Sequence, residues 1–314
     1  MTLNFFYCFD SGYNIQAQCS IFSLLENVSE KINISIIHKE ISEKTFLDDK
    51  ILNKKKLNYL SVSKFNKETS LFPNINGTHV SEATYYRIYA ENYIDKNLDF
   101  LIYLDADIIC YSNPIPELKM NIVNLKQSNN IISAKTENTI TDGITRLDMK
   151  SNKYFNAGVL IIDYTKWIEN NIQRKLSNLL VEKQTKLTFW DQDLLNIFFD
   201  SEFEELSSNL NHKMPLDQNV RILDLENDSW VTNNMIFIHY SGKFKPWNVK
   251  GILDKRSSYY QVVYRKLFKE SYQVSYNYKK NALIDLINGF RRRRVFDLEF
   301  PISFIFLVLK SLFK

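Results

Sequence analysis

The segment Phe100-Leu-Ile-Tyr-Leu-Asp-Ala-Asp-Ile-Ile-Cys110 places two carboxylates, Asp105 and Asp107, inside an apolar run. A short run rich in Ile and Leu predicts a strand that is buried on both faces. Strand side chains alternate, so both carboxylates are expected on one side of the backbone. Like charges repel unless a cation lies near them. The segment therefore predicts either a divalent-metal site that faces a phosphate-bearing ligand, or a strand end whose carboxylates face water or cap a turn.

Strands and helices are predicted to alternate along the first part of the chain. Residues 3–9, 32–37 and 57–62 have the composition of strands, while residues 14–28 and 41–56 space their apolar side chains as helices do. This alternation is typical of a mostly parallel central sheet with helices on both faces. We therefore expect an α/β fold. The polar residues 136–152 are expected to form a surface loop beside a site.

Composition favours a soluble-type globular chain with an unusual C-terminal segment. Of the 314 residues 45% are hydrophobic, and the formal net charge is +4. Residues 279–314 hold eight Lys or Arg against three Asp or Glu, so the remainder of the chain carries −1. Three cysteines without a metal-binding spacing favour a reducing compartment. The N-terminus has no basic region before its apolar residues and is expected to be a first strand.

The C-terminal segment combines a basic cluster, Arg291–Arg294, with the apolar residues 300–309. This combination predicts an interfacial anchor, because basic residues contact anionic headgroups and aromatic side chains enter the acyl boundary. The run is too short to span a bilayer. No nucleic-acid-binding motif accompanies the basic cluster, so nucleic acid is not an expected partner. We expect a catalytic domain over residues 1–250 and a helical, basic and aromatic membrane-association segment over residues 251–314.

His239 lies at the end of a predicted strand and is followed by Gly242, Lys243 and Lys245. A lone histidine at a strand end is usually structural, but a glycine with nearby amines suits a phosphate. Two carboxylates and one imidazole are a coherent set for Mn²⁺ or Mg²⁺ that also binds phosphate oxygens, and imidazole favours Mn²⁺. No glycine-rich phosphate loop is present. These residues predict a nucleotide diphosphate that is bound through a metal.

Six motifs occur in order along the chain. They are Asp10-Ser-Gly-Tyr13, Ala83-Thr-Tyr-Tyr-Arg87, Tyr103-Leu-Asp-Ala-Asp107, Phe155-Asn-Ala-Gly-Val159, Asp191-Gln-Asp193 and the segment from His239 to Lys245-Pro-Trp247. In this order the set resembles glycosyltransferase family 8. Within the family it is most similar to bacterial lipooligosaccharide α-galactosyltransferases and lipopolysaccharide glucosyltransferases. The resemblance covers about residues 3–250.

The resemblance implies a GT-A fold and a retaining hexosyltransferase that uses Mn²⁺, with Mg²⁺ as the alternative. It implies a UDP-hexose donor, UDP-galactose or UDP-glucose, and a lipid-linked lipooligosaccharide or lipopolysaccharide acceptor. Such an enzyme is expected in the cytoplasm, peripheral on the inner face of the cytoplasmic membrane. The alternatives are a transferase that acts on a protein or another cell-surface glycan, and a UDP-sugar-binding protein with little transfer activity.

The resemblance also implies roles for individual residues. The implied metal ligands are Asp105, Asp107 and His239. The implied donor-binding residues are Asp10, Tyr13, Arg87, Ala106, Asn156, Gly242 and Lys245. The residues expected at the reactive sugar carbon are Gln192, Asp191 and Asp193. At position 11 the chain has serine where relatives have a second acid, so contacts to the ribose or base are expected to differ.

The route of sugar transfer stays open between two mechanisms. A double displacement requires a carboxylate nucleophile, and Asp193 is the candidate. Gln192, which the resemblance places closest to the sugar, is a weak nucleophile, so front-face attack is favoured, with Gln192 stabilising the positive charge on the sugar. A purely structural interpretation of Asp191 and Asp193 is also available, since acidic residues stabilise the first turn of a helix.

Overall fold

A seven-stranded sheet forms the centre of the computed structural model, which describes residues 2–67, 72, 82–137, 141–216, 234–276 and 278–312. Four of its six strand pairings are parallel, and β7 pairs antiparallel with both of its neighbours. The strands, in spatial order, are β3 (Leu57–Lys64), β2 (Ile32–His38), β1 (Asn4–Phe9), β4 (Phe100–Leu104), β7 (Phe155–Asp163), β6 (Ile132–Thr136) and β8 (Glu204–Glu205). The predicted α/β class and the mostly parallel sheet are confirmed.

Helices cover both faces of this sheet because its strands are apolar on both sides. Along β1, Phe5 and Tyr7 belong to one core and Phe6 and Cys8 to the other. The first core includes helices α1 (Asn14–Asn27) and α3 (Ile115–Gln127). The second includes the 3₁₀ segment η3 (Glu82–Asn92) and the helices α5 (Tyr164–Glu169), α6 (Ile172–Lys183) and α7 (Trp190–Phe199).

A second, three-stranded sheet continues from the central one. Its order is β5 (Ile108–Cys110), β10 (Phe237–His239) and β9 (His212–Lys213). β10 runs antiparallel to β5, and this register sets His239 opposite Ile108. The chain therefore passes from the central sheet to the second sheet between Leu104 and Ile108.

Two local predictions are wrong. Residues 41–56 form only a 3₁₀ turn at Lys44–Phe46 and the short helix α2 (Asp49–Leu52). Asp48 has extended backbone and its carboxylate accepts from the Lys50 N–H, so it begins a new helix and ends any continuous one. The predicted loop at residues 136–152 contains helix α4 (Thr141–Arg146).

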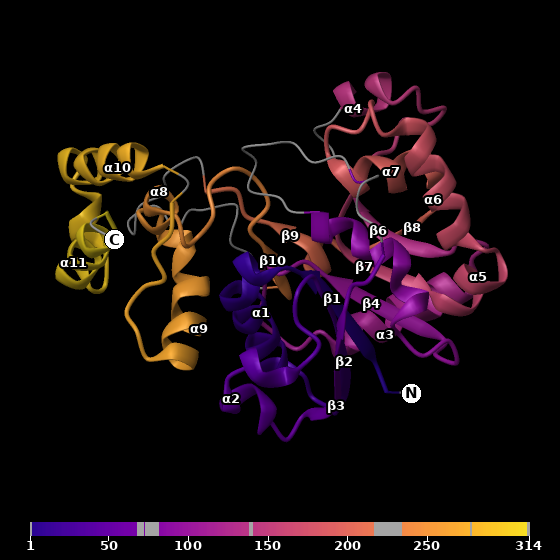
Figure 1. Ribbon diagram of the computed structural model, residues 1–314, viewed down its shortest axis with the longest axis horizontal. Helices are drawn as coiled ribbons and strands as arrows, with labels where there is room; N and C mark the ends of the chain where they lie inside the picture. The colour runs from indigo at the N-terminus through magenta and orange to yellow at the C-terminus, as the bar shows by residue number, and fades with distance from the viewer. Residues whose placement is uncertain are drawn as a thin grey trace.

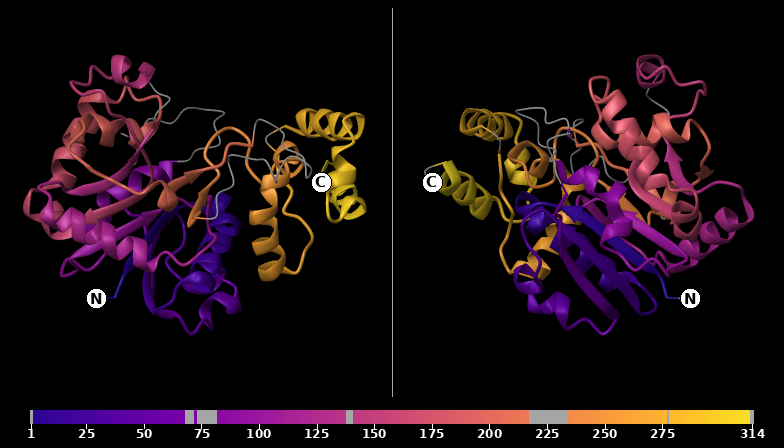
Figure 2. Two further views of the ribbon diagram at one scale, coloured as in Figure 1. Left: turned by 180° about the vertical axis from the view of Figure 1, so that it is seen from behind. Right: turned by 45° about the vertical axis from the view of Figure 1, so that its right-hand side comes forward.

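The C-terminal helices lie at one end of the molecule and α4 to α7 at the other (Figures 1 and 2). They are α8 (Val249–Ile252), α9 (Ser258–Phe268), α10 (Lys279–Arg291) and α11 (Pro301–Leu312). α9 packs on α1, whereas α8, α10 and α11 share a core that contains Leu286, Phe304 and Val308. No helix in the described ranges is long and apolar enough to cross a membrane. A separate unit from residue 251 onward stays a prediction.

We expect Gly251→Ala to destabilise the fold by about 3 kcal/mol, because a Cβ atom there would lie 1.9 Å from the backbone oxygen of Lys245. The matched control is Gly289→Ala, where the added atom meets Leu253 Cδ1 at 2.7 Å and that side chain can move. Its expected cost is about 1 kcal/mol or less. Urea unfolding measures both, and equal costs for the two variants would contradict the packing that holds Lys245 against α8.

Candidate active site

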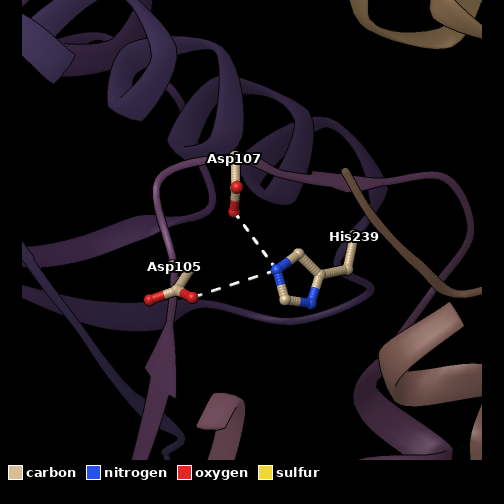
Figure 3. A group of neighbouring side chains, drawn as sticks. All are labelled: Asp105, Asp107 and His239. Carbon is tan, nitrogen blue, oxygen red and sulfur yellow. Dashed lines mark ion pairs between the residues drawn. The ribbon is translucent and has the colours of Figure 1, made fainter. Parts of the chain in front are cut away.

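Asp105 and Asp107 lie in a tight turn between the two sheets, so the predicted continuous strand is interrupted at the carboxylates. The N–H of Asp105 still donates to Gly158 on β7, while the N–H of Tyr240 beyond β10 donates to the carbonyl of Asp107. Because the backbone turns at this point, the two charged side chains do not lie within a buried layer of the sheet, where unpaired charges are costly. The register of β5 and β10 then brings His239 next to both carboxylates (Figure 3).

The three side chains converge on one point and offer three donor atoms. His239 Nε2 lies 3.4 Å from Asp107 Oδ1 and 3.9 Å from Asp105 Oδ2. Asp107 Oδ1 is buried and has no hydrogen-bond partner among the residues that the structure describes. One oxygen from each carboxylate and one ring nitrogen lie within 4.8 Å of one another. This donor set, with an orphaned buried oxygen, fits a divalent cation of the Mn²⁺ type.

Asn211 fixes the tautomer of His239 so that Nε2 presents a lone pair. The Asn211 side-chain oxygen lies 2.9 Å from His239 Nδ1, and the Asn211 amide group donates to Asn156 Oδ1 at 3.0 Å. Asn156 Oδ1 is identified as oxygen because it also accepts from the Gly158 N–H. Asn211 therefore accepts from His239, which places the proton on Nδ1. An outer partner of this kind is typical of metal-ligating histidines.

The carboxylate oxygens that do not face His239 are each bound by a buried cationic side chain, a separate one for each carboxylate. Asp105 Oδ1 accepts from Arg87 at 3.1 Å and from the Tyr103 hydroxyl at 2.7 Å. Asp107 Oδ2 accepts from Lys245 at 2.7 Å. Burial alone would raise the pKa of Asp107, but Lys245 and His239 outweigh burial and hold the pKa well below its usual range. Both carboxylates are thus anchored with one oxygen turned toward His239.

Gln192 is held in one orientation by three hydrogen bonds. Its amide oxygen accepts from the Ala157 N–H at 3.1 Å and from Asn156 at 3.2 Å, and its amide group donates to the Tyr154 hydroxyl at 3.1 Å. Because a backbone N–H identifies the oxygen, the amide can point in only one direction. Both lone pairs of that oxygen are engaged, so Gln192 presents a fixed dipole to the cavity.

Asp193 does not face the cavity. It is fully buried and accepts hydrogen bonds from Tyr154, from both terminal nitrogens of Arg146, and from the backbone N–H groups of Thr188 and Phe189. Five donors on two oxygens leave little capacity for a further bond. Asp193 therefore anchors the start of α7 and, through Tyr154, the side chain of Gln192.

Asp191 lies against the buried guanidinium of Arg87, with Oδ2 2.8 Å from Nε. Arg87 also donates to the backbone oxygens of Thr84 and Ala157 and lies over the Tyr103 ring at 3.8 Å. Burial raises the pKa of Asp191 to about 6 despite Arg87, and the charge of Asp105 adds to the rise. Arg87 is thus an electrostatic support for Asp105 as well as part of the cavity wall.

A cavity of about 800 Å³ connects these side chains. Of the predicted site residues, its lining includes Tyr13, Arg87, Asp105, Ala106, Asp107, Asn156, Asp191, Gln192, His239, Gly242 and Lys245. Asp10 and Asp193 are not among its described lining residues. Asp10 instead caps the 3₁₀ turn Ser11–Tyr13 by accepting from the Gly12 N–H.

Sequence reasoning missed four residues that support the site. Asn211 and Arg146 have no local signal, since their partners lie 28 and 47 positions away. Tyr154 adjoins the Phe155-Asn-Ala-Gly motif and could have been found there as a hydroxyl at the start of a buried strand. Glu40, which lies just beyond the end of β2, accepts from the Ser11 N–H and hydroxyl, so it places a carboxylate beside position 11.

Asp191→Asn is expected to raise the free energy of unfolding at pH 8 by on the order of 2 kcal/mol. The folded pKa of about 6 lies above the ordinary aspartate pKa of 3.8, so the folded state binds the extra proton. The cost of ionising Asp191 is therefore fully present above pH 6 and absent below about pH 4, where the two proteins should be equally stable. The control Asp193→Asn should instead lose about 3 kcal/mol, because it breaks a satisfied buried cluster. Urea unfolding at both pH values tests this, and a destabilised Asp191→Asn at pH 8 would contradict it.

Comparison with known proteins places this site in a family. The model of Glycosyl transferase family 8 matches residues 4–251. A lipopolysaccharide 1,2-glucosyltransferase of Escherichia coli is 27% identical over 256 residues, which are 79% of this chain and 74% of the relative. A lipopolysaccharide 1,3-galactosyltransferase of Salmonella typhimurium is 29% identical over 177 residues, 54% of this chain and 50% of the relative.

A solved structure shares the fold. The galactosyltransferase LgtC, solved in complex with donor and acceptor sugar analogues, aligns with a TM-score of 0.68 at 21% identity. The alignment covers 85% of this chain and 96% of LgtC. This likeness confirms the predicted GT-A architecture. Because the family model matches well over half of its residues, the chain belongs to glycosyl transferase family 8.

Proposed function

We propose that this chain is a retaining hexosyltransferase that moves glucose or galactose from a UDP-sugar to a sugar of a lipooligosaccharide or lipopolysaccharide core, with Mn²⁺. The observation that carries the proposal is the convergence of Asp105, Asp107 and His239 on one point of the cavity wall. Family membership supports glycosyl transfer, and the names of the similar bacterial enzymes support the hexose and the acceptor class.

Asp105, Asp107 and His239 would hold the metal, which when bound neutralises the negative charge of the donor's diphosphate. Lys245 supplies a second positive charge at the same place, since it already donates to Asp107 Oδ2. Gly242 and Lys243 also line the cavity beside it. Charge that develops on the leaving UDP is stabilised by this arrangement without rearranging the backbone.

The carbohydrate end of the site favours front-face attack. A sugar losing UDP becomes positively charged, and the partial negative charge of the Gln192 amide oxygen, which Ala157 and Asn156 hold in place, would stabilise that charge. A double displacement through Asp193 has less support, because that carboxylate is fully buried and already accepts five hydrogen bonds. The acceptor hydroxyl then loses its proton to the departing phosphate.

The base end of the site is assigned to Tyr13, whose ring packs edge-on against Trp247 at 6.1 Å. Tyr13 is half-buried and lines the cavity, and it is the aromatic residue that we assign to a uracil base. Asp10, which caps the preceding turn, fixes the backbone that carries Tyr13. This assignment puts the base and the reactive sugar on opposite sides of the metal ligands.

We also propose that the C-terminal helices bind the inner face of the cytoplasmic membrane. On α11, Ile302 and Phe306 are 82% and 62% exposed, while Phe304 and Val308 are buried against α8 and α10. The basic residues 291–294 precede this helix. An apolar face beside a basic cluster suits an anionic lipid surface. An acceptor that is anchored in lipid would then lie at the same surface.

The function is tested by UDP release from a panel of UDP-hexoses in the presence of Mn²⁺, with and without lactose and a deacylated core oligosaccharide. We expect UDP-glucose or UDP-galactose to be hydrolysed slowly, and faster with an acceptor, and a chelator to stop both. Gln192→Ala should reduce turnover at least tenfold because its dipole is lost. Absence of UDP release from every donor would refute the proposal, whereas hydrolysis without transfer would favour a UDP-sugar-binding protein.

Membrane binding is tested by sedimentation with vesicles that contain anionic phospholipid. The double variant Ile302→Ser, Phe306→Ser should bind at least tenfold more weakly, since it removes two exposed apolar side chains without touching the buried face of α11. The matched control replaces two exposed apolar residues of α3, Met120→Ser and Val123→Ser, which are 53% and 52% exposed. Equal binding by the two double variants would show that α11 is not the anchor.

A further inference from the structure

Helix α10 has three distinct faces. One packs into the core shared with α8 and α11, and its residues are Ala282, Leu286 and Gly289. A second is apolar and exposed, and its residues are Leu283, Ile287 and Phe290. The third carries Asn281 and Asp285, which are one turn apart and line the cavity of the active site. The C-terminal part of the chain therefore forms one wall of that cavity.

The α10 end of the cavity differs chemically from the end that holds the metal ligands. Besides Asn281 and Asp285, it is lined by Tyr278 and Lys250. Tyr278 is 62% exposed, so an aromatic ring is presented to solvent at the rim. Lys250 lies over the Phe244 ring at 3.8 Å. An amide, a carboxylate and an open aromatic ring are the groups that bind hydroxyls and the apolar face of a sugar ring.

Asp285 has unused hydrogen-bonding capacity. In the part of the chain that the structure describes, no side chain or backbone group donates a hydrogen bond to its carboxylate. Partial burial raises its pKa, and the charge of Lys250 opposes the rise. A carboxylate at this position repels the diphosphate of a donor, so this end of the cavity suits an uncharged, hydroxyl-rich ligand.

We propose that α10 forms the acceptor-binding wall, in which Asn281 and Asp285 hydrogen-bond hydroxyls of the acceptor glycan and Tyr278 packs against a sugar ring. This inference rests on the proposed function and adds the residues that recognise the acceptor. On α10, Leu283, Ile287 and Phe290 lie on the side of the helix axis opposite Asn281 and Asp285.

The test compares Asp285→Asn and Asn281→Ala with the control Lys280→Ala, a neighbouring exposed position that is not among the described lining residues of the cavity. Each protein is given its UDP-hexose with Mn²⁺ and either lactose or a deacylated core oligosaccharide. UDP release without acceptor reports the donor site, and addition of one hexose, measured by mass spectrometry, reports transfer. Melting temperatures check that all variants are folded.

We expect Asp285→Asn and Asn281→Ala to lose transfer per UDP released at least tenfold, with a raised KM for acceptor and an unchanged KM for donor. Lys280→Ala should behave as the wild type. Wild-type transfer by both variants, or a raised KM for donor alone, would overturn the assignment of α10 to the acceptor. A wild type that hydrolyses the donor but elongates neither glycan would overturn the glycan ligand, and no hydrolysis at all would instead refute the proposed function.

Discussion

The structure depends on one electrostatic constraint, which is that two carboxylates of like charge lie in a single turn at a buried junction. Asp105 and Asp107 satisfy it by dividing their oxygens. One oxygen of each is bound to a fixed cation, Arg87 or Lys245, and the other is turned toward His239. The cost of burying Arg87 is in turn offset by Asp191, whose own ionisation is made less favourable by burial. The charged groups of Arg87, Lys245 and Asp191 therefore help to hold one oxygen of each carboxylate, Asp105 and Asp107, toward His239.

A continuous hydrogen-bond chain joins His239 to Gln192 and extends beyond it to Arg146. It runs from His239 through Asn211, Asn156, Gln192, Tyr154 and Asp193 to Arg146. Two backbone N–H groups, those of Ala157 and Gly158, determine which side-chain atoms in this chain are acceptors and which are donors. Side-chain amides can normally turn over, but these two anchors allow one orientation for each member. The tautomer of His239 and the orientation of Gln192 are therefore fixed by the same strand, β7.

Sequence patterns predicted the parts of the site that are encoded locally. The alternation of strands and helices predicts the fold class, and the residue types of Asp105, Asp107 and His239 suggest a candidate metal site, because few residue types bind metals. The strand was wrongly extended through the carboxylates, because periodicity cannot show that a chain leaves one sheet for another. The role of Arg146 was not predicted, because the polar residues 136–152 around it were expected to form a loop. Asn211 could not be identified at all, since its role arises only when β9 and β10 pair.

Gly158 limits how such an enzyme can be redesigned. A Cβ atom at this position would lie 2.2 Å from His239 Cε1 and 3.0 Å from Asp105 Oδ2, so even alanine is too large. Any variant library that keeps His239 and Asp105 in their present positions must leave residue 158 as glycine. Diversity has to be introduced elsewhere in the cavity lining, for example at Tyr13 or at Phe189 and Trp190, where α7 begins. Substitutions are therefore restricted where Gly158 contacts His239 and Asp105, and other residues of the cavity lining can be varied more freely.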